Sequence, residues 1–426
     1  MHHWFDLDGK HYTSLKRLVQ GRLSLPNDIL ILMNYTSIYI HIPFCKRRCY
    51  YCDFNTYSGM DYLIEDYVEA LCHEIELVGG LSSQKDVIHT IYFGGGTPSL
   101  LKLNLIEKII NKLKKSFSFS ESVEVSIEAN PGTLDFEKAK AYQEMGINRV
   151  SIGAQSLNEE ELQLLGRIHN VNDIFQAVDW FHKAGLDNLN LDLIFGLPGQ
   201  TMDKWEKTIT AAQYFEPTHF SLYCLTIEPG TKFNHWLTDG KISPGDDDFA
   251  ADCYDLACEL LGGRGYEHYE ISNWAKCDQN NELLICRHNE QYWENLPYYG
   301  FGAGAHGFIQ NMRIANIPNP KDYITKMNIS LFNNYSISPT TIGTHFVNKI
   351  EEMNDTLMLG LRLLIEGVGE NNFRERFGLE INDLYGEKIN SLIKKGLLEW
   401  VELDQKRVRL TKNAYFLGNI VFREFV

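Results

Sequence analysis

The chain has 426 residues, enough for two or three domains, and 40 basic against 56 acidic residues give it a formal charge of -16. This acidic balance excludes a globally basic surface for nucleic acid. Nine cysteines with three of them close together are not the pattern of a disulfide framework, and no apolar run is long enough to span a bilayer. We therefore expect a soluble, cytoplasmic protein.

Residues 1–34 show no clear core pattern and lack the basic-then-apolar layout of a signal peptide. Met33 stands just before the first predicted strand. Two interpretations stay open. Either an N-terminal extension of unclear role precedes a late first strand, or translation starts at Met33.

From about residue 37 to residue 225, apolar strands alternate with amphipathic helices. The predicted strands are 38–42, 90–93, 123–128, 149–153, 189–194 and 219–225. The predicted helices between them are 62–77, 106–115, 136–145, 174–184 and 205–214. This alternation predicts an α/β fold with a parallel sheet, as a (β/α) barrel or a doubly wound sheet. In either case the loops after the carboxyl ends of the strands carry the chemistry.

The pattern changes beyond residue 225. A turn-rich stretch, a helix, a strand and a region rich in aromatic residues, His and Gly follow at 226–245, 246–261, 266–271 and 273–310. Helical patterns (357–364 and 381–395) and two short strand-like runs (397–401 and 407–410) then predict a small winged-helix-like module. We expect no nucleic-acid binding from it, because the chain is acidic and a fold does not by itself carry a function. The expected domains are 1–34, 35–235, 236–340 and 341–426.

Three cysteines, Cys45, Cys49 and Cys52, follow the first predicted strand within eight residues. Three thiols are one too few to close a four-thiolate iron–sulfur or zinc site. A [4Fe-4S] cluster held by them keeps one iron open for a small molecule. The alternative is a zinc ion completed by a distant His or Cys. The C-x3-C-x2-C spacing resembles the signature of radical S-adenosylmethionine (SAM) enzymes, in which SAM chelates the open iron.

Polar motifs at the predicted strand ends suit a SAM pocket. Glycines in the Phe93–Ser99 segment let the backbone approach a ligand closely through its amides. Glu128 and Asp192 are carboxylates that can accept ribose hydroxyls, and the Arg167 guanidinium suits the SAM carboxylate. Each also has a plainer interpretation, as a turn, a solvated strand end or a structural cap.

The series HIPFC, CxxxCxxCDF, FGGGTPS, EANP, GAQS, LGRIH and DLIFGLPGQT resembles the oxygen-independent coproporphyrinogen III oxidase family of radical SAM proteins. The resemblance implies a partial (β/α)6 barrel followed by a smaller C-terminal domain. It implies cluster ligation by the three cysteines and no assigned catalytic residue. The SAM contacts that it implies are Tyr39, Tyr51, Gly95, Gly96, Thr97, Glu128, Gln155, Arg167, Asp192 and Thr226.

Two features favour the heme chaperone branch of that family. Oxidases that resemble this chain carry a fourth cysteine two positions after the third, where this chain has Phe54. The segment from His288 to Trp293 resembles the HNxxYW motif of the chaperones, and His is an ordinary axial ligand of heme iron. The plainer interpretation is a core histidine beside aromatic residues. His306, in a glycine-rich turn, is a further pocket candidate.

The resemblance thus implies a protein that binds heme and transfers it to an acceptor, a respiratory hemoprotein at a membrane. The implied partners include an electron donor such as flavodoxin or ferredoxin. One alternative is an enzyme that oxidatively decarboxylates coproporphyrinogen III with a 5'-deoxyadenosyl radical. The other is a radical SAM enzyme that acts on another substrate, such as RNA.

Overall fold

The computed structural model describes residues 35–81, 86–329 and 337–426, which form two compact units. The barrel unit comprises residues 35–264 and 296–347, and the C-terminal unit comprises residues 265–295 and 348–426. These limits differ from the expected divisions after 235 and 340, because residues 296–347 add strands to the barrel sheet. The expectation for residues 1–34 lies outside the described residues.

The barrel unit is built on six parallel strands, and the predicted α/β fold class is confirmed. They pair in the order β1 (Tyr35–Ile42), β4 (Val87–Gly95), β5 (Ser118–Ala129), β6 (Arg149–Gln155), β7 (Leu189–Phe195) and β8 (His219–Cys224). In β1 and β7 nearly every residue is buried, as in a parallel sheet covered on both faces. The carboxyl ends of all six strands therefore lie at one edge of the sheet.

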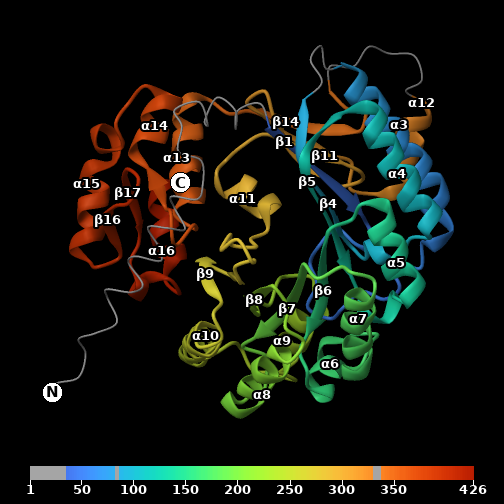
Figure 1. Ribbon diagram of the computed structural model, residues 1–426, viewed down its shortest axis with the longest axis horizontal. Coiled ribbons are helices and arrows are strands. Elements are labelled where there is room, and N and C mark those ends of the chain that lie inside the picture. Colours follow the sequence, from blue (N-terminus) through green and yellow to red (C-terminus); the bar gives the residue numbers. More distant parts are fainter. Residues whose placement is uncertain (1–34, 82–85, 330–336) are drawn as a thin grey trace. The chain divides into compact units, whose positions relative to one another are not determined.

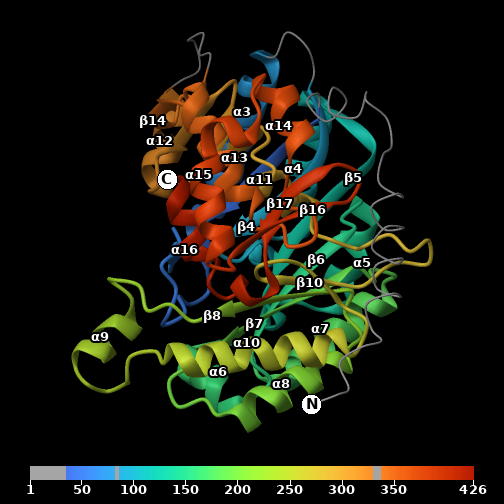
Figure 2. The same cartoon turned by 90° about the vertical axis from the view of Figure 1, so that its left-hand side faces the viewer.

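Helices connect and cover these strands (Figure 1). They are α3 (Ile64–Leu81), α4 (Leu103–Ser116), α5 (Phe136–Met145), α6 (Glu159–Leu165), α7 (Val171–Lys183), α8 (Met202–Gln213), α9 (Lys232–Thr238) and α10 (Asp247–Gly262). Their ends follow capping chemistry: Asp135 accepts the Lys138 amide at the start of α5, and Gly146 closes it in the left-handed conformation. Figure 2 shows α8 and α10 side by side, where the Trp205 indole donates to the Cys253 carbonyl (2.8 Å).

Residues 296–347 extend the sheet beyond β1, which the sequence patterns did not predict. β11 (Tyr298–Phe301) pairs parallel with β1, and β12 (His306–Ile309), β13 (Met312–Asn316) and β14 (Thr341–Phe346) follow in antiparallel order. The helix α12 (Pro320–Ile329) packs against α3. Two short parallel strands, β2 (Phe44–Cys45) and β3 (Tyr57–Ser58), close the loop that carries the three cysteines.

The C-terminal unit has the predicted helices followed by a hairpin. Its elements are β9 (Glu267–Glu270), β10 (Asn273–Ala275), α11 (Arg287–Trp293), α13 (Lys349–Gly360), β15 (Val368–Gly369), α14 (Glu370–Phe377), α15 (Ile381–Lys394), β16 (Leu398–Glu402), β17 (Lys406–Leu410) and α16 (Gly418–Phe422). Leu357, Phe373, Ile389 and Val408 belong to its core. Across the described ranges, no helix is long and apolar enough to cross a membrane.

Candidate radical SAM site and heme motif

The cysteine loop, residues 45–58, is held at its base and from the side. β2 and β3 pair across the base, and the Tyr57 amide donates to the Pro43 carbonyl (2.7 Å). From the side, Arg47 donates through Nε to the carbonyl of Gly166 (3.0 Å) and through Nη2 to the carbonyl of Arg167. The loop is therefore fixed to the segment that follows α6.

Each thiol has a different polar neighbour. The sulfur–neighbour pairs are Cys45 with Thr97 Oγ1 (3.5 Å), Cys49 with Arg167 Nη1 (3.3 Å) and Cys52 with Thr56 Oγ1 (4.0 Å). Burial raises the pKa of the Cys45 thiol to about 11, and it also raises the pKa of Cys52. Metal binding therefore has to displace protons from these thiols, as it does in thiolate sites generally.

Within the described ranges, no three His, Cys, Asp or Glu side chains converge as around a single metal ion. A cube of four irons is wider than one ion, so its thiolate ligands stand further apart. The thiols lie near enough to one another that Cys52 and Cys49 add to the raised pKa of Cys45, and Cys49 adds to that of Cys52.

Arg167 carries an unused hydrogen-bond donor beside the cysteines. Gly166 ends α6 in the left-handed conformation (φ 74°), which sends the chain to Arg167. The guanidinium donates through Nη2 to the Gly153 carbonyl (2.7 Å) and through Nη1 to Cys49, while the buried Nε has no hydrogen-bond partner among the described residues. A buried cation with an unmet donor fits an incoming carboxylate, as the SAM methionine group would supply.

The glycine loop after β4 packs against the strand that leads to the cysteines. A side chain at Gly96 would approach the Phe44 carbonyl to 2.7 Å, and Gly95 has a φ of 110° that favours glycine. The amides of Gly95, Gly96 and Thr97 donate to Glu128, Ile42 and Phe44, respectively. These amides already have acceptors in this structure, and whether the loop binds SAM stays a prediction. An amino group is itself a donor, so carbonyl oxygens of this loop suit it better.

Two half-buried carboxylates lie near each other on the parallel strands, Glu128 near the end of β5 and Asp192 in the middle of β7. Glu128 accepts hydrogen bonds from Tyr92 Oη (3.0 Å) and the Gly95 amide (3.1 Å), and Asp192 accepts one from Ser151 Oγ (2.9 Å). Burial, with the charge of Asp192 as a second cause, raises the pKa of Glu128 to about 7. Burial raises the pKa of Asp192 as well. Hydroxyl donors of a ribose would satisfy such carboxylates.

The sequence predicts four further SAM contacts, Gln155, Tyr39, Tyr51 and Thr226. Gln155 has a left-handed backbone (φ 71°), a conformation that residues other than glycine rarely adopt. It lies where the register between β6 and β7 shifts. Tyr39 is half-buried, with Oη 3.0 Å from His41 Nδ1, and Tyr51 lies edge-on to Phe233 at 6.5 Å. Thr226 follows β8 as an exposed residue.

The glycine-rich turn 302–304 fixes the far side of the cysteine loop. Asn55 donates to the carbonyls of Ala303 (3.1 Å) and Pro318 (3.0 Å), and the Asn55 carbonyl lies 3.0 Å from His41 Nε2. A side chain at Gly304 would overlap the Asn55 amide. Asn55, His41 and Tyr92 carry no signal in the sequence, because their contacts are with residues far away along the chain.

In the C-terminal unit, the HNxxYW motif forms the short helix α11. His288 is 1% exposed, and its Nε2 lies 2.8 Å from Tyr292 Oη, one helical turn later. The two rings meet edge-to-face at 4.9 Å. His306 lies in the barrel unit, where it is exposed and acts electrostatically on His41. Whether His306 shares a pocket with His288 stays a prediction.

Known proteins match almost the whole chain. Residues 39–212 match the radical SAM superfamily, and residues 347–417 match the HemN C-terminal domain. The heme chaperone HemW of Bacillus subtilis (strain 168) is 34% identical over 391 residues, which cover 92% of this chain and 99% of that protein. HemW of Synechocystis sp. (strain ATCC 27184 / PCC 6803 / Kazusa) is 39% identical over 77% of this chain and 78% of that protein.

The chain belongs to the HemW family. The solved structure of the coproporphyrinogen III oxidase HemN from Escherichia coli has a TM-score of 0.77 over 95% of this chain and 93% of that one. At 20% identity, this likeness shows a shared fold. Membership in the radical SAM superfamily implies a [4Fe-4S] cluster and SAM. Which residues of this HemW-family chain hold them stays a prediction.

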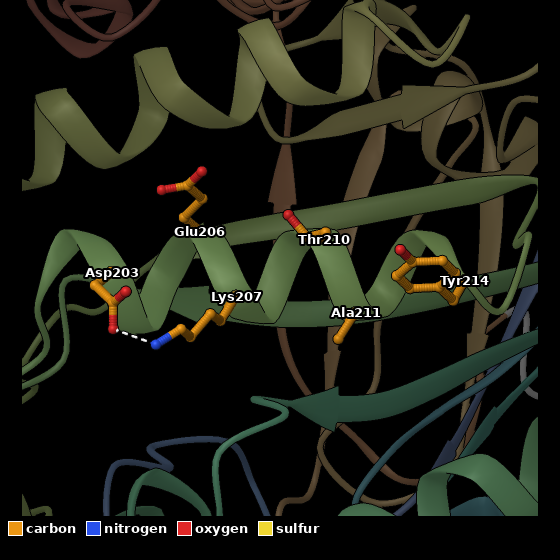
Figure 3. Close-up of a pocket in the computed structure, with 6 residues that line it drawn as sticks. All are labelled: Asp203, Glu206, Lys207, Thr210, Ala211 and Tyr214. Atoms are coloured by element: carbon orange, nitrogen blue, oxygen red, sulfur yellow. Dashed lines mark hydrogen bonds and ion pairs between the residues drawn. The ribbon is translucent and has the colours of Figure 1, made fainter.

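A hollow of about 490 Å³ lies elsewhere on this HemW-family chain. It runs along α8 and is lined by Asp203, Glu206, Lys207, Thr210, Ala211 and Tyr214 (Figure 3). It contains an exposed ion pair between Lys207 and Asp203 (2.7 Å). Its lining includes none of the predicted site residues, and one exposed ion pair is ordinary helix-surface chemistry. We assign no function to it.

Proposed function

We propose that this chain is a cytoplasmic heme chaperone that takes up heme and transfers it to an acceptor hemoprotein. In this proposal Cys45, Cys49 and Cys52 hold a [4Fe-4S] cluster to which SAM binds. Two curated relatives with the name heme chaperone HemW, similar over most of their length, support it. A cluster held by thiolates also favours a reducing compartment such as the cytoplasm.

The observation that carries the proposal is the pair His288 and Tyr292. The imidazole is the kind of ligand that heme iron takes, and the tyrosine hydroxyl lies 2.8 Å from its Nε2. Because His288 is 1% exposed, heme can reach it only after local opening of α11. The structure is then a closed state, in which Tyr292 occupies a nitrogen that heme iron would take.

Phe54 favours the chaperone over the oxidase alternative. It is 65% exposed at the position where the oxidases that resemble this chain have a fourth cysteine. Arg48 lies across this part of the loop and donates to the carbonyls of Cys52 (3.2 Å) and Phe54 (3.3 Å). The cysteine loop thus carries three thiols and presents an aromatic ring to the outside.

The cluster residues would serve heme transfer in a redox or regulatory way. When bound, the cluster with SAM supplies one-electron chemistry, for which an electron donor such as flavodoxin or ferredoxin is the proposed partner. The contributions of the chain are to hold the thiols, to present the Arg167 donor to a carboxylate and to keep Glu128 and Asp192 for hydroxyl groups. The proposed heme acceptor is a respiratory hemoprotein at a membrane.

An anaerobic heme titration of the cluster-loaded protein, followed in the Soret region, tests the proposal. We expect saturable binding near one heme per chain for the wild type and a clear loss of affinity for His288→Ala. His288→Gln keeps a side chain that can form a hydrogen bond with Tyr292. It therefore separates loss of the imidazole that ligates iron from loss of folding. His235→Ala is the matched control, because His235 is an exposed histidine on α9.

Three results would argue against the proposal. Absence of saturable binding by the wild type would overturn it and direct attention to coproporphyrinogen turnover. An equal loss of heme affinity in the His235 and His288 variants would indicate nonspecific binding of heme to surface histidines. Unchanged affinity in both His288 variants would remove this residue as the ligand.

A further inference from the structure

A cation lies on the tryptophan of the heme motif. Arg362, two residues after α13, places its guanidinium 4.2 Å from the centroid of the Trp293 ring and 5.7 Å from that of Phe422. All three residues belong to the C-terminal unit. A guanidinium stacked on an aromatic face is held in place, while its N–H groups point outward around its edge.

The hydrogen bonds of Arg362 are incomplete. Its Nη2 lies 3.6 Å from Glu270 Oε2, which is too long for a hydrogen bond. Among the described residues, Arg362 Nε and Glu270 Oε2 have no hydrogen-bond partner. Both atoms are buried, and the Glu270 side chain as a whole is 1% exposed. Burial raises the pKa of Glu270, and the charge of Arg362 offsets this only in part. The ion pair therefore leaves both groups short of partners.

A second arginine in the C-terminal unit, Arg376 on α14, has a complete set of hydrogen bonds. Arg376 contacts Glu352 through Nε (3.0 Å) and Nη2 (2.7 Å). It also donates to the backbone carbonyls of Glu294 (3.2 Å) and Asn295 (2.7 Å) at the end of α11. Arg376 thus has a structural task that uses its N–H groups. Arg362 contacts Trp293, the residue before Glu294, and has no comparable set of hydrogen bonds among the described residues.

The Trp293 indole adds a further unused donor. Its Nε1 is buried and has no hydrogen-bond partner in the described part of the chain, so the adjoining side chains of Trp293 and Arg362 hold two unmet N–H groups. The Arg362 side chain is 22% exposed, which leaves part of it open to a ligand. Groups that only donate need an acceptor, and a guanidinium prefers a planar carboxylate.

We propose that Arg362, together with the Nε1 group of Trp293, binds a propionate carboxylate of the porphyrin that His288 ligates. This inference rests on the proposed function, and it assigns the carboxylate end of the cargo as well as the metal end. A chain with a formal charge of -16 repels an anionic ligand, so a dedicated cation beside the motif has a physical purpose. Arg362 then exchanges a long contact with Glu270 for a charge-assisted hydrogen bond.

Heme and heme dimethyl ester, titrated in the same detergent-containing buffer, test the assignment. The ester keeps the iron and the ring but lacks the carboxylates. For Arg362→Ala we expect affinity for heme to fall by roughly tenfold to a hundredfold, with affinity for the ester unchanged. Arg362→Lys should lose part of that discrimination, because it keeps the charge without the fork. Arg374→Ala, which removes an exposed arginine paired with Glu380, should leave both ligands unaffected.

The outcomes separate this inference from the proposed function. If Arg362→Ala weakens heme and ester equally, Arg362 only supports Trp293 and the assignment is overturned. If neither affinity changes, it is overturned as well. A wild type that binds neither ligand overturns the proposed function and this inference together. If His288→Ala loses affinity for heme and for the ester, and Arg362→Ala loses affinity for heme alone, the proposed function and this inference are both supported.

Discussion

The Arg167 guanidinium donates to the Cys49 sulfur at 3.3 Å, which joins the segment after α6 to the cysteine loop. The same side chain donates to the Gly153 carbonyl (2.7 Å) and keeps Nε without a partner. One arginine thus positions a thiol and presents a donor to the adjoining space. Its neighbours explain why a cation is stable in this buried place, since a carbonyl and a sulfur share its hydrogen bonds.

Arg167→Lys should lower the affinity for SAM by tenfold or more, because an ammonium cannot bind a sulfur, a carbonyl and a carboxylate together. We expect the iron and sulfide content of the reconstituted protein to stay unchanged. Anaerobic equilibrium dialysis with SAM, alongside iron and sulfide analysis, measures both quantities. Arg48→Lys is the control, since Arg48 bonds only loop carbonyls in the described contacts. Unchanged SAM affinity would remove Arg167 from the pocket.

Gly304→Ala should weaken the cluster site, because the new methyl group overlaps the amide of Asn55. Gly185→Ala is a matched control: the two glycines have nearly the same φ (76° and 77°), but nothing lies within 4 Å of a side chain at Gly185. Both variants should lose about 1 kcal/mol of unfolding free energy to the left-handed backbone. Only Gly304→Ala should also shorten the lifetime of the cluster in air, followed by its visible absorbance. Equal cluster lifetimes would contradict this prediction.

Glu74→Ala should destabilise the barrel unit by about 3 kcal/mol or more. Glu74 is fully buried in α3 and accepts hydrogen bonds from Gly302 N, Asn316 Nδ2, Tyr323 Oη, Ser338 Oγ and Thr340 Oγ1. Removing it leaves these donors unpaired. Glu76→Ala, two residues later, removes only an exposed pair with Lys112 and should change the free energy by less than about 1 kcal/mol. Urea denaturation followed by circular dichroism compares the two, and similar losses would refute the prediction.

The free energy of unfolding of the protein without SAM should fall as the pH rises through the pKa of Glu128. The folded-state pKa of about 7 lies above the ordinary 4.5, so the folded chain keeps a proton that the unfolded chain releases between these values. This contribution is complete below pH 4.5 and is lost as pH rises through 7. Between pH 4.5 and pH 8, the free energy of unfolding of Glu128→Gln should therefore rise by about 3 kcal/mol relative to that of the wild type. Denaturation at both pH values measures it, and an unchanged difference would show that Glu128 ionises normally.

Much of the barrel could be predicted from the sequence because its determinants are local. Strands buried on both faces appear as short apolar runs, and helices between them have periodic apolar positions. The predicted helix 136–145 coincides with α5, which has an Asp cap and a Gly cap at its ends. The extension β11–β14 was missed, since its strands are short and β11 finds its partner β1 about 260 residues earlier, where Gly300 pairs with Tyr39.

Within the candidate site, the sequence by itself determined the spacing of Cys45, Cys49 and Cys52 and the order of the strand-end motifs. These features depend on covalent spacing and on chain order, which folding cannot change. Only the tertiary structure decided that Gly304 adjoins Asn55, that Glu74 gathers donors from the sheet extension and that Arg362 lies on Trp293. Each of these contacts joins residues tens to hundreds of positions apart, and their hydrogen bonds and packing exist only once the chain has brought them together.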